Sequence, residues 1–133
     1  MKRDLSRGPG GGTGAAVTLG RGEVLFRRGA EAASIFRVES GRIRLERHLE
    51  DGAAVTLAVL GPGDYVAEAA LFSDVYHCDA RAEVGSRVRV FPKREVADGL
   101  SRDPEALMRW SKRLAGHVRR LRALLELRSI QRA

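Results

Sequence analysis

Residues 41–49 read GRIRLERHL, and the central positions of this stretch alternate apolar with charged side chains. Ile43 and Leu45 fall on one face and Arg44 and Glu46 on the other, because successive side chains of a strand point to opposite faces. Such alternation is typical of a half-buried strand in an antiparallel sheet with one wet face. The stretch therefore predicts a β domain.

Glycine turns bound this strand and its neighbours. Gly41 precedes it, Glu50-Asp51-Gly52 follows it, and Gly61-Pro62-Gly63-Asp64 supplies a third turn. Strand-length apolar runs lie between such turns at 23–26, 34–40, 41–49, 53–60, 64–72 and 86–92. Many short strands with glycine turns predict a closed or sandwiched, mainly β domain rather than alternating strands and helices.

The sequence period changes after Pro92. Residues 93–100 can form a short helix, and a long helix should begin at Pro104, with Asp103 as its N-cap. The apolar positions of that helix recur at spacings of three and four residues, which is typical of a helix that buries one face. They are Leu107, Trp110, Leu114, Val118, Leu121 and Leu125.

A second subunit is needed to cover this stripe. Roughly 29 helical residues span about 43 Å, which exceeds the diameter of a β domain of about 80 residues. A parallel pair of helices buries the same stripe twice in one symmetric contact. We therefore predict a homodimer formed through the C-terminal helix.

Composition limits the organisation of the chain. Its 133 residues, 44% of them hydrophobic, can form one domain with an appended element. We expect a disordered arm at 1–16, a β domain at 17–100 and a helix at 103–133. The sequence has neither an apolar run of about 18 residues nor a signal peptide, so we expect a cytoplasmic protein without a membrane segment. The single cysteine, Cys78, excludes an internal disulfide.

The net charge of +7 comes almost entirely from the last segment. Residues 105–133 contain eight Lys or Arg against two Glu, whereas residues 1–104 contain 16 basic and 15 acidic side chains. A basic helix could lie near a phosphate backbone, or it could present the solvated outer face of a dimer helix. No motif that reads a DNA groove accompanies the charge, which favours the second interpretation.

The order of these elements resembles the Crp/Fnr family of transcription regulators and the wider cyclic-nucleotide-binding domain group. The residues that carry the likeness are GEVLFRRGAEAASIFRVESGRIRLERHLEDG at 22–52, LGPGDYVAEAALF at 60–72 and the long basic helix. The resemblance covers about residues 19–133. It implies a β-roll of the jelly-roll, or double-stranded β-helix, type, with short flanking helices and a long C-terminal dimerisation helix.

In the family's nucleotide-binding members, a phosphate cassette of the form G-E-x-x-L followed by R-[ST]-A comes after the G-x-G-D turn. The resemblance implies that Glu68 matches the glutamate that accepts a hydrogen bond from the ribose hydroxyl. Ala67, however, replaces the glycine, Cys78 stands where the phosphate-binding arginine belongs, and Asp79 stands where Ser or Thr belongs. Without the arginine, a cyclic phosphate loses its bidentate, charge-assisted hydrogen bonds.

Arg81 could replace the missing phosphate-binding arginine only if its side chain pointed to the ligand side of the strand. On a strand, however, residue 81 faces away from residues 80 and 82. We therefore expect a domain that keeps the family scaffold and has changed or lost its ligand, so the small-molecule effector is unknown. The candidate pocket residues are Glu68, Ala69, Tyr76, His77, Cys78, Asp79 and Arg81.

Tyr76-His77-Cys78 is the one chemically suggestive cluster in this region. It could form a redox-sensitive thiol with His77 as proton acceptor, or an axial haem ligand of the kind some family members use. The alternative is that Cys78 is a small buried hydrophobic residue and the rings fill a vacated pocket. We expect no metal and no cofactor, because His48 and His117 are far from His77 in sequence and no H-x-H pair occurs.

The family normally continues past its dimer helix into a helix-turn-helix domain, whose second helix enters the major groove. This chain stops at Ala133, so DNA would be bound only through a domain that this chain lacks. The first functional hypothesis is the effector-sensing and dimerisation domain of a regulator. The alternative is a stand-alone module that modulates full-length relatives. An enzyme ranks third, because no nucleophile, base and orienting group occur together.

Overall fold

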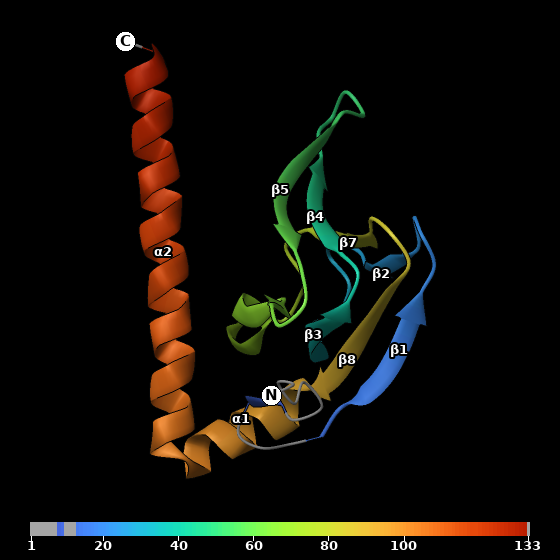
Figure 1. Ribbon diagram of the computed structural model, residues 1–133, viewed down its shortest axis with the longest axis vertical. Helices are drawn as coiled ribbons and strands as arrows, with labels where there is room; N and C mark the ends of the chain where they lie inside the picture. Colours follow the sequence, from blue (N-terminus) through green and yellow to red (C-terminus); the bar gives the residue numbers. More distant parts are fainter. Residues whose placement is uncertain (1–7, 10–12, 133) are drawn as a thin grey trace.

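The computed structural model describes residues 8–9 and 13–132. Two four-stranded antiparallel sheets occur in these residues, with a short 3-10 helix, η2, between their strands and two α-helices after them (Figure 1). One sheet has the strand order β1-β8-β3-β6 and the other β2-β7-β4-β5. The mainly β prediction is confirmed, whereas the jelly-roll designation stays a prediction.

The strands of the first sheet are β1 (Ala15–Leu19), β8 (Ser86–Pro92), β3 (Ser34–Ser40) and β6 (Tyr65–Val66). Those of the second are β2 (Val24–Phe26), β7 (Asp79–Ala82), β4 (Ile43–His48) and β5 (Ala54–Leu60). The predicted alternating strand is β4: Ile43 is fully buried, and Leu45 packs against the same core. Ala80 and Ala82 of β7 also face this core.

Three features differ from the sequence prediction. β1 begins at Ala15, inside the range predicted as an arm, because backbone pairing of Ala15 and Ala16 with β8 requires no apolar pattern. The rest of that range, apart from residues 8–9 and 13–14, lies outside the described residues. The run 64–72 is not one strand, since only Tyr65–Val66 pairs and Glu68–Phe72 forms η2. β7, which was not among the six apolar runs, completes the second sheet.

Gly41 shows why a glycine is needed in the turn before β4. Its φ of 88° lies in the left-handed region that side chains disfavour. A Cβ at this position would also collide with Ser86 and with the backbone of Gly85. The turn therefore requires glycine for its backbone conformation and for the close approach of β8.

The helices are α1 (Lys93–Arg102) and α2 (Pro104–Arg132). The carboxylate of Asp103 accepts a hydrogen bond from the backbone N–H of Ala106 at 3.1 Å, which confirms the predicted N-cap. None of the helices among the described residues is long and apolar enough to span a membrane. No helix-turn-helix occurs in the part of the chain that the structure describes.

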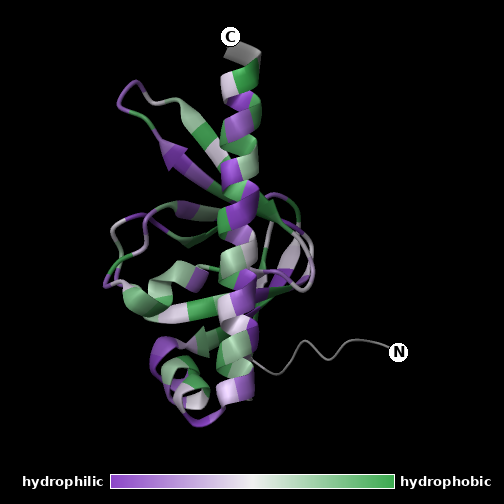
Figure 2. Ribbon diagram, turned by 90° about the vertical axis from the view of Figure 1, so that its left-hand side faces the viewer, coloured by the Kyte–Doolittle hydropathy of each residue, from purple (hydrophilic) through white to green (hydrophobic). Residues whose placement is uncertain are grey.

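Only the first part of α2 packs against its own chain. Ala106 and Trp110 are buried in a second core with α1 and β6, and Leu114 packs partly against it. From Val118 to Ile130 every residue of α2 is exposed, although apolar side chains recur along it (Figure 2). The helix stands alongside the strands, and the β4-β5 hairpin rises next to its C-terminal half (Figure 1). An apolar face of α2 is thus without a partner within the described residues.

Candidate functional site

The cassette follows β6 directly, where the chain turns into η2 through Ala67. Ala67 has φ 66° and ψ 37°, the left-handed conformation, and it is the one non-glycine residue with positive φ among the described residues. This is the position at which the sequence comparison expected glycine. The backbone adopts the left-handed conformation that favours glycine although the residue is alanine, so Ala67 carries local strain.

Replacing Ala67 with glycine should stabilise the domain. Relief of the left-handed strain outweighs the extra chain entropy of glycine, and we expect a gain of about 0.5 to 1 kcal/mol in the free energy of unfolding. Urea unfolding followed by circular dichroism measures it. Ala69→Gly is the matched control, because Ala69 lies exposed in η2 at negative φ and should lose stability. A lower free energy of unfolding for Ala67→Gly than for the wild type would contradict the inference that Ala67 is strained.

Glu68 connects the cassette to α2. Its side chain is only 8% exposed, and its carboxylate lies 3.3 Å from Nδ1 of His117 and 3.7 Å from Nε of Arg113. Burial raises the pKa of Glu68, against the opposing effects of His117 and Arg113. Both partners come from the long helix, and neither was identified from the sequence. The residue predicted to match a ribose-binding glutamate is thus held by α2.

Aromatic contacts fix α2 beside the same site. The ring of Trp110 packs edge-on against Tyr65 with the centroids 5.1 Å apart, and the guanidinium of Arg113 lies over the Tyr65 ring at 4.6 Å. Trp110 was expected in the dimer stripe, but it lies in the core of its own chain and is 3% exposed. The indole docks here because Tyr65 of β6 faces the helix. α2 is therefore anchored to the strand that leads into the cassette.

Tyr76 is held in the core. Its hydroxyl donates to the carbonyl of Ser34 at 2.8 Å and accepts from the Ser34 N–H at 3.2 Å, while its ring stacks on Phe26 with a centroid distance of 3.9 Å. His77 is exposed, and its Nε2 lies 2.8 Å from the hydroxyl of Ser73. Ala69 is also exposed. Of these three candidates, only Tyr76 lies in the interior.

Cys78 lies at the edge of the interior, half-buried against the main core. Burial raises the pKa of its thiol, the charge of Asp79 raises that pKa further, and Arg47 acts in the opposite direction. A thiol with a raised pKa is mostly protonated at neutral pH and is a poor nucleophile.

Asp79 and Arg81 lie on the outer face of β7, opposite the buried Ala80 and Ala82. Asp79 accepts a hydrogen bond from the Arg28 N–H at 2.7 Å, which holds the pKa of the carboxyl below its usual range, with His48 adding to the effect. Arg81 donates to Glu46 at 2.9 Å and to the carbonyl of Gly22 at 2.9 Å. The structure therefore directs both side chains away from the core that Cys78 contacts.

Glu46, His48 and Asp79 have ligand atoms within 4.8 Å of one another, a grouping that could hold a metal ion. Sequence reasoning did not find it, because only the register of β4 on β7 places Glu46 opposite Asp79. Each carboxylate already has a side-chain partner, Arg81 for Glu46 and His48 for Asp79. We assign no metal to this group, and the expected absence of a metal stays a prediction.

A sequence model of the cyclic nucleotide-binding domain matches residues 16–103. The chain belongs to this family. It is similar to the transcriptional regulator LdrP of Thermus thermophilus, with 36% identity over 103 residues that cover 77% of this chain and 50% of LdrP. This member of the family thus spans about half the length of the curated relatives it matches.

Solved structures give the same assignment. A CRP-family transcriptional regulator of Thermus thermophilus is 34% identical, with a TM-score of 0.67 over 80% of this chain and 52% of that one. The catabolite activator protein of the same species is 25% identical, with a TM-score of 0.76 over 87% and 55%. The sensor domain of the regulator DNR of Pseudomonas aeruginosa shares the fold, with 23% identity and a TM-score of 0.72 over 80% and 72%.

The predicted resemblance is therefore confirmed, and the chain is a cyclic nucleotide-binding domain of the kind found in Crp/Fnr-like transcriptional regulators. These relatives are regulators rather than enzymes. Within this family domain, Glu68 lies in η2 and Cys78 immediately precedes β7. The pocket assignments themselves stay predictions.

Proposed function

We propose that this chain is the effector-sensing and dimerisation domain of a Crp/Fnr-type regulator whose phosphate cassette no longer recognises a cyclic phosphate. The observation that carries the proposal is the environment of Cys78. This residue occupies the arginine position and contacts the core, while Arg81, the nearest arginine along the strand, is turned to the outer face and bound to Glu46.

Loss of the arginine removes the strongest expected interaction with the ligand. A guanidinium–phosphate pair forms two charge-assisted hydrogen bonds, and a neutral thiol replaces neither of them. Glu68 remains, but its carboxylate faces His117 and Arg113, so a ribose hydroxyl would compete with two side chains of α2. Calorimetric titration with cyclic AMP tests the proposal, and a dissociation constant below about 10 µM would contradict it.

The contact of Glu68 with α2 supports a sensing role for a ligand that binds beside Glu68. A ligand that approaches Glu68 meets the two side chains that tie the cassette to the helix. Because the same helix carries the exposed apolar face, occupancy of the pocket can change how that face is presented to a second subunit.

A stand-alone module that pairs with full-length relatives is the second candidate function. The unpartnered apolar face of α2 favours it equally, since such a face can pair with a relative as well as with a second copy. The two functions differ in one observable feature, a helix-turn-helix segment in the same reading frame, which the regulator requires and the module does not.

The cysteine should be unreactive in the folded domain. The raised pKa of Cys78 and its contact with the core predict that an aromatic disulfide reagent at neutral pH labels it at least about tenfold more slowly than it labels the unfolded chain. Absorbance of the released thiolate measures both rates on the same preparation, with and without denaturant. Labelling of the folded domain at the unfolded rate, or a Soret band on addition of haem, would favour the redox or haem interpretation instead.

A further inference from the structure

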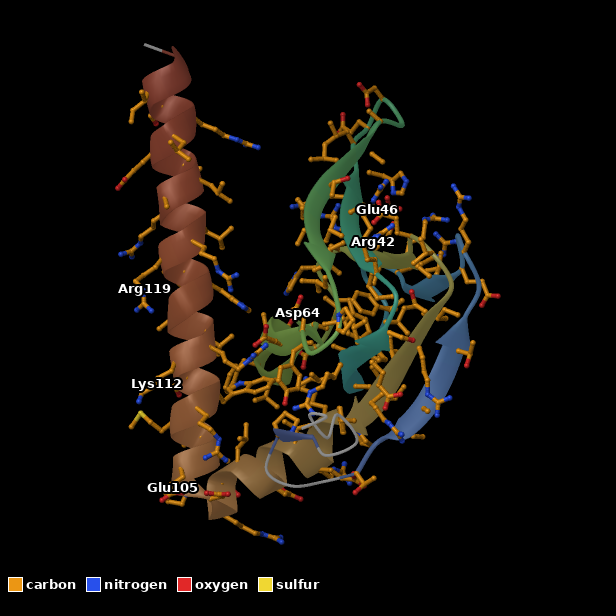
Figure 3. The ribbon with its side chains drawn as sticks, in the orientation of Figure 1. Arg42, Glu46, Asp64, Glu105, Lys112 and Arg119 are labelled. Carbon is orange, nitrogen blue, oxygen red and sulfur yellow. The ribbon has the colours of Figure 1, made fainter. Side chains whose placement is uncertain are left out.

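The outer face of the β2-β7-β4-β5 sheet carries a cluster of charged side chains that the cassette does not use. Arg44 of β4 pairs in register with Arg81 of β7, so two arginines lie side by side on this face. Arg42 and Glu46 lie among the strands, beyond β5 as seen from α2 (Figure 3). The cluster is therefore separate from the contact between Glu68 and α2.

A pocket of about 230 Å³ opens on this face. The turn between β1 and β2 supplies Arg21 to it, β4 supplies Arg44, and β7 supplies Arg81. Its remaining lining residues are Gly22, Ala82 and Glu83. Three guanidinium-bearing side chains from distant parts of the sequence thus line one space.

These arginines keep hydrogen-bond donors to spare. A guanidinium has five N–H donors. Arg44 donates one to Glu83, and its buried Nε has no partner within the described residues. Arg81 uses one donor on Glu46 and one on the carbonyl of Gly22. Arg21 is exposed and forms no hydrogen bond or ion pair with the part of the chain that the structure describes.

The local charge is positive even after the internal ion pairs are counted. Arg42 joins the three lining arginines through its ion pair with Glu83 at 3.2 Å. Four arginines thus stand against three carboxylates, those of Glu46 and Glu83 and that of Asp79 within 4.8 Å of Glu46. A cation is disfavoured here. An anion would receive bidentate, charge-assisted hydrogen bonds from planar donors.

We propose that this pocket binds a phosphate group, at a site distinct from the cassette and independent of the function proposed above. Its volume is several times the space of about 30 Å³ that one water takes up in the liquid, which accommodates a phosphate and part of an attached group. The phosphate could be free or carried by a small sugar phosphate. Both present the same tetrahedral oxyanion to Arg21, Arg44 and Arg81.

The test is titration of the isotope-labelled 133-residue chain with inorganic phosphate and, separately, with ribose 5-phosphate, at constant ionic strength. We expect saturable amide shifts at Gly22, Arg81, Ala82 and Glu83 in nuclear magnetic resonance spectra. Tighter binding of ribose 5-phosphate identifies a phosphate ester as the ligand, and equal affinities identify free phosphate. Shifts that grow linearly with either probe, or that centre on Glu68, would overturn the proposal.

Substitutions distinguish phosphate binding at this site from nonspecific electrostatic attraction to the basic surface. Arg21 lies in an exposed turn and has no hydrogen bond or ion pair with the described residues, so Arg21→Gln should keep the fold while phosphate affinity falls about tenfold. Glu83→Gln removes the competing carboxylate and should tighten binding by a similar factor. Arg94→Gln, an exposed arginine of α1, removes the same charge elsewhere and should leave the affinity unchanged. An equal loss in Arg21→Gln and Arg94→Gln would overturn the proposal.

Discussion

Val118→Asp and Leu121→Asp should each convert a dimer into a monomer at micromolar concentration. Val118 is 47% exposed and Leu121 60% exposed on the C-terminal half of α2. A second copy of the helix would bury both. A carboxylate placed in such a seam is unpaired and desolvated twice in the symmetric dimer, at a cost of about 3 kcal/mol or more for each charge. For the two charges of the dimer together this corresponds to roughly ten-thousandfold weaker association.

Sedimentation velocity at several micromolar concentrations measures the change directly. Lys112→Asp is the control, because Lys112 points away from the strands (Figure 3) and is separated by more than a quarter turn from the positions tested. Lys112→Asp changes the net charge by more than Val118→Asp or Leu121→Asp does, yet it should leave the dimer intact. Circular dichroism checks that each variant keeps its helix. If the wild-type chain sediments as a monomer, α2 has another partner and the homodimer is wrong.

Cyclic AMP should bind at most weakly to the wild-type chain, and Cys78→Arg should create measurable affinity. The new guanidinium would start from the position where Cys78 contacts the core and could reach a phosphate near Glu68. One charge-assisted, bidentate pair contributes about 1.5 to 3 kcal/mol, so we expect a gain of about ten- to a hundredfold.

Asp79→Ser should add little to that gain and should cost stability. The Asp79 carboxylate accepts a part-buried hydrogen bond from the Arg28 N–H and contacts His48, so replacing it weakens both interactions. The Cys78 prediction is measured by isothermal titration calorimetry with cyclic AMP. Comparing Cys78→Arg with Cys78→Met separates the effect of the added charge from the effect of the larger side chain. If Cys78→Met gains as much as Cys78→Arg, or if the wild type already binds below about 10 µM, the missing arginine is not what limits binding.

The sequence alone was sufficient for features encoded within a few residues. The alternation around Ile43 and Leu45 predicted β4, the Asp103-Pro104 pair predicted the start of α2, and the Gly63-Asp64 turn located the cassette. Each rests on side-chain periodicity or on a local backbone requirement, which neighbouring residues determine by themselves. The departures at Ala67 and Cys78 were equally visible, since they need only a comparison of spacing.

Only the tertiary structure decided which distant residues meet. The register of β7 on β4 brings Asp79 beside Glu46 and His48 and places Arg81 against Glu46, across more than 30 residues of sequence. The docking of Trp110 on Tyr65 brings His117 and Arg113 of α2 to Glu68. Such pairings depend on sheet register and helix packing, which the chain as a whole determines. For that reason the outer arginine pocket and the partners of Glu68 could not be predicted from local sequence patterns.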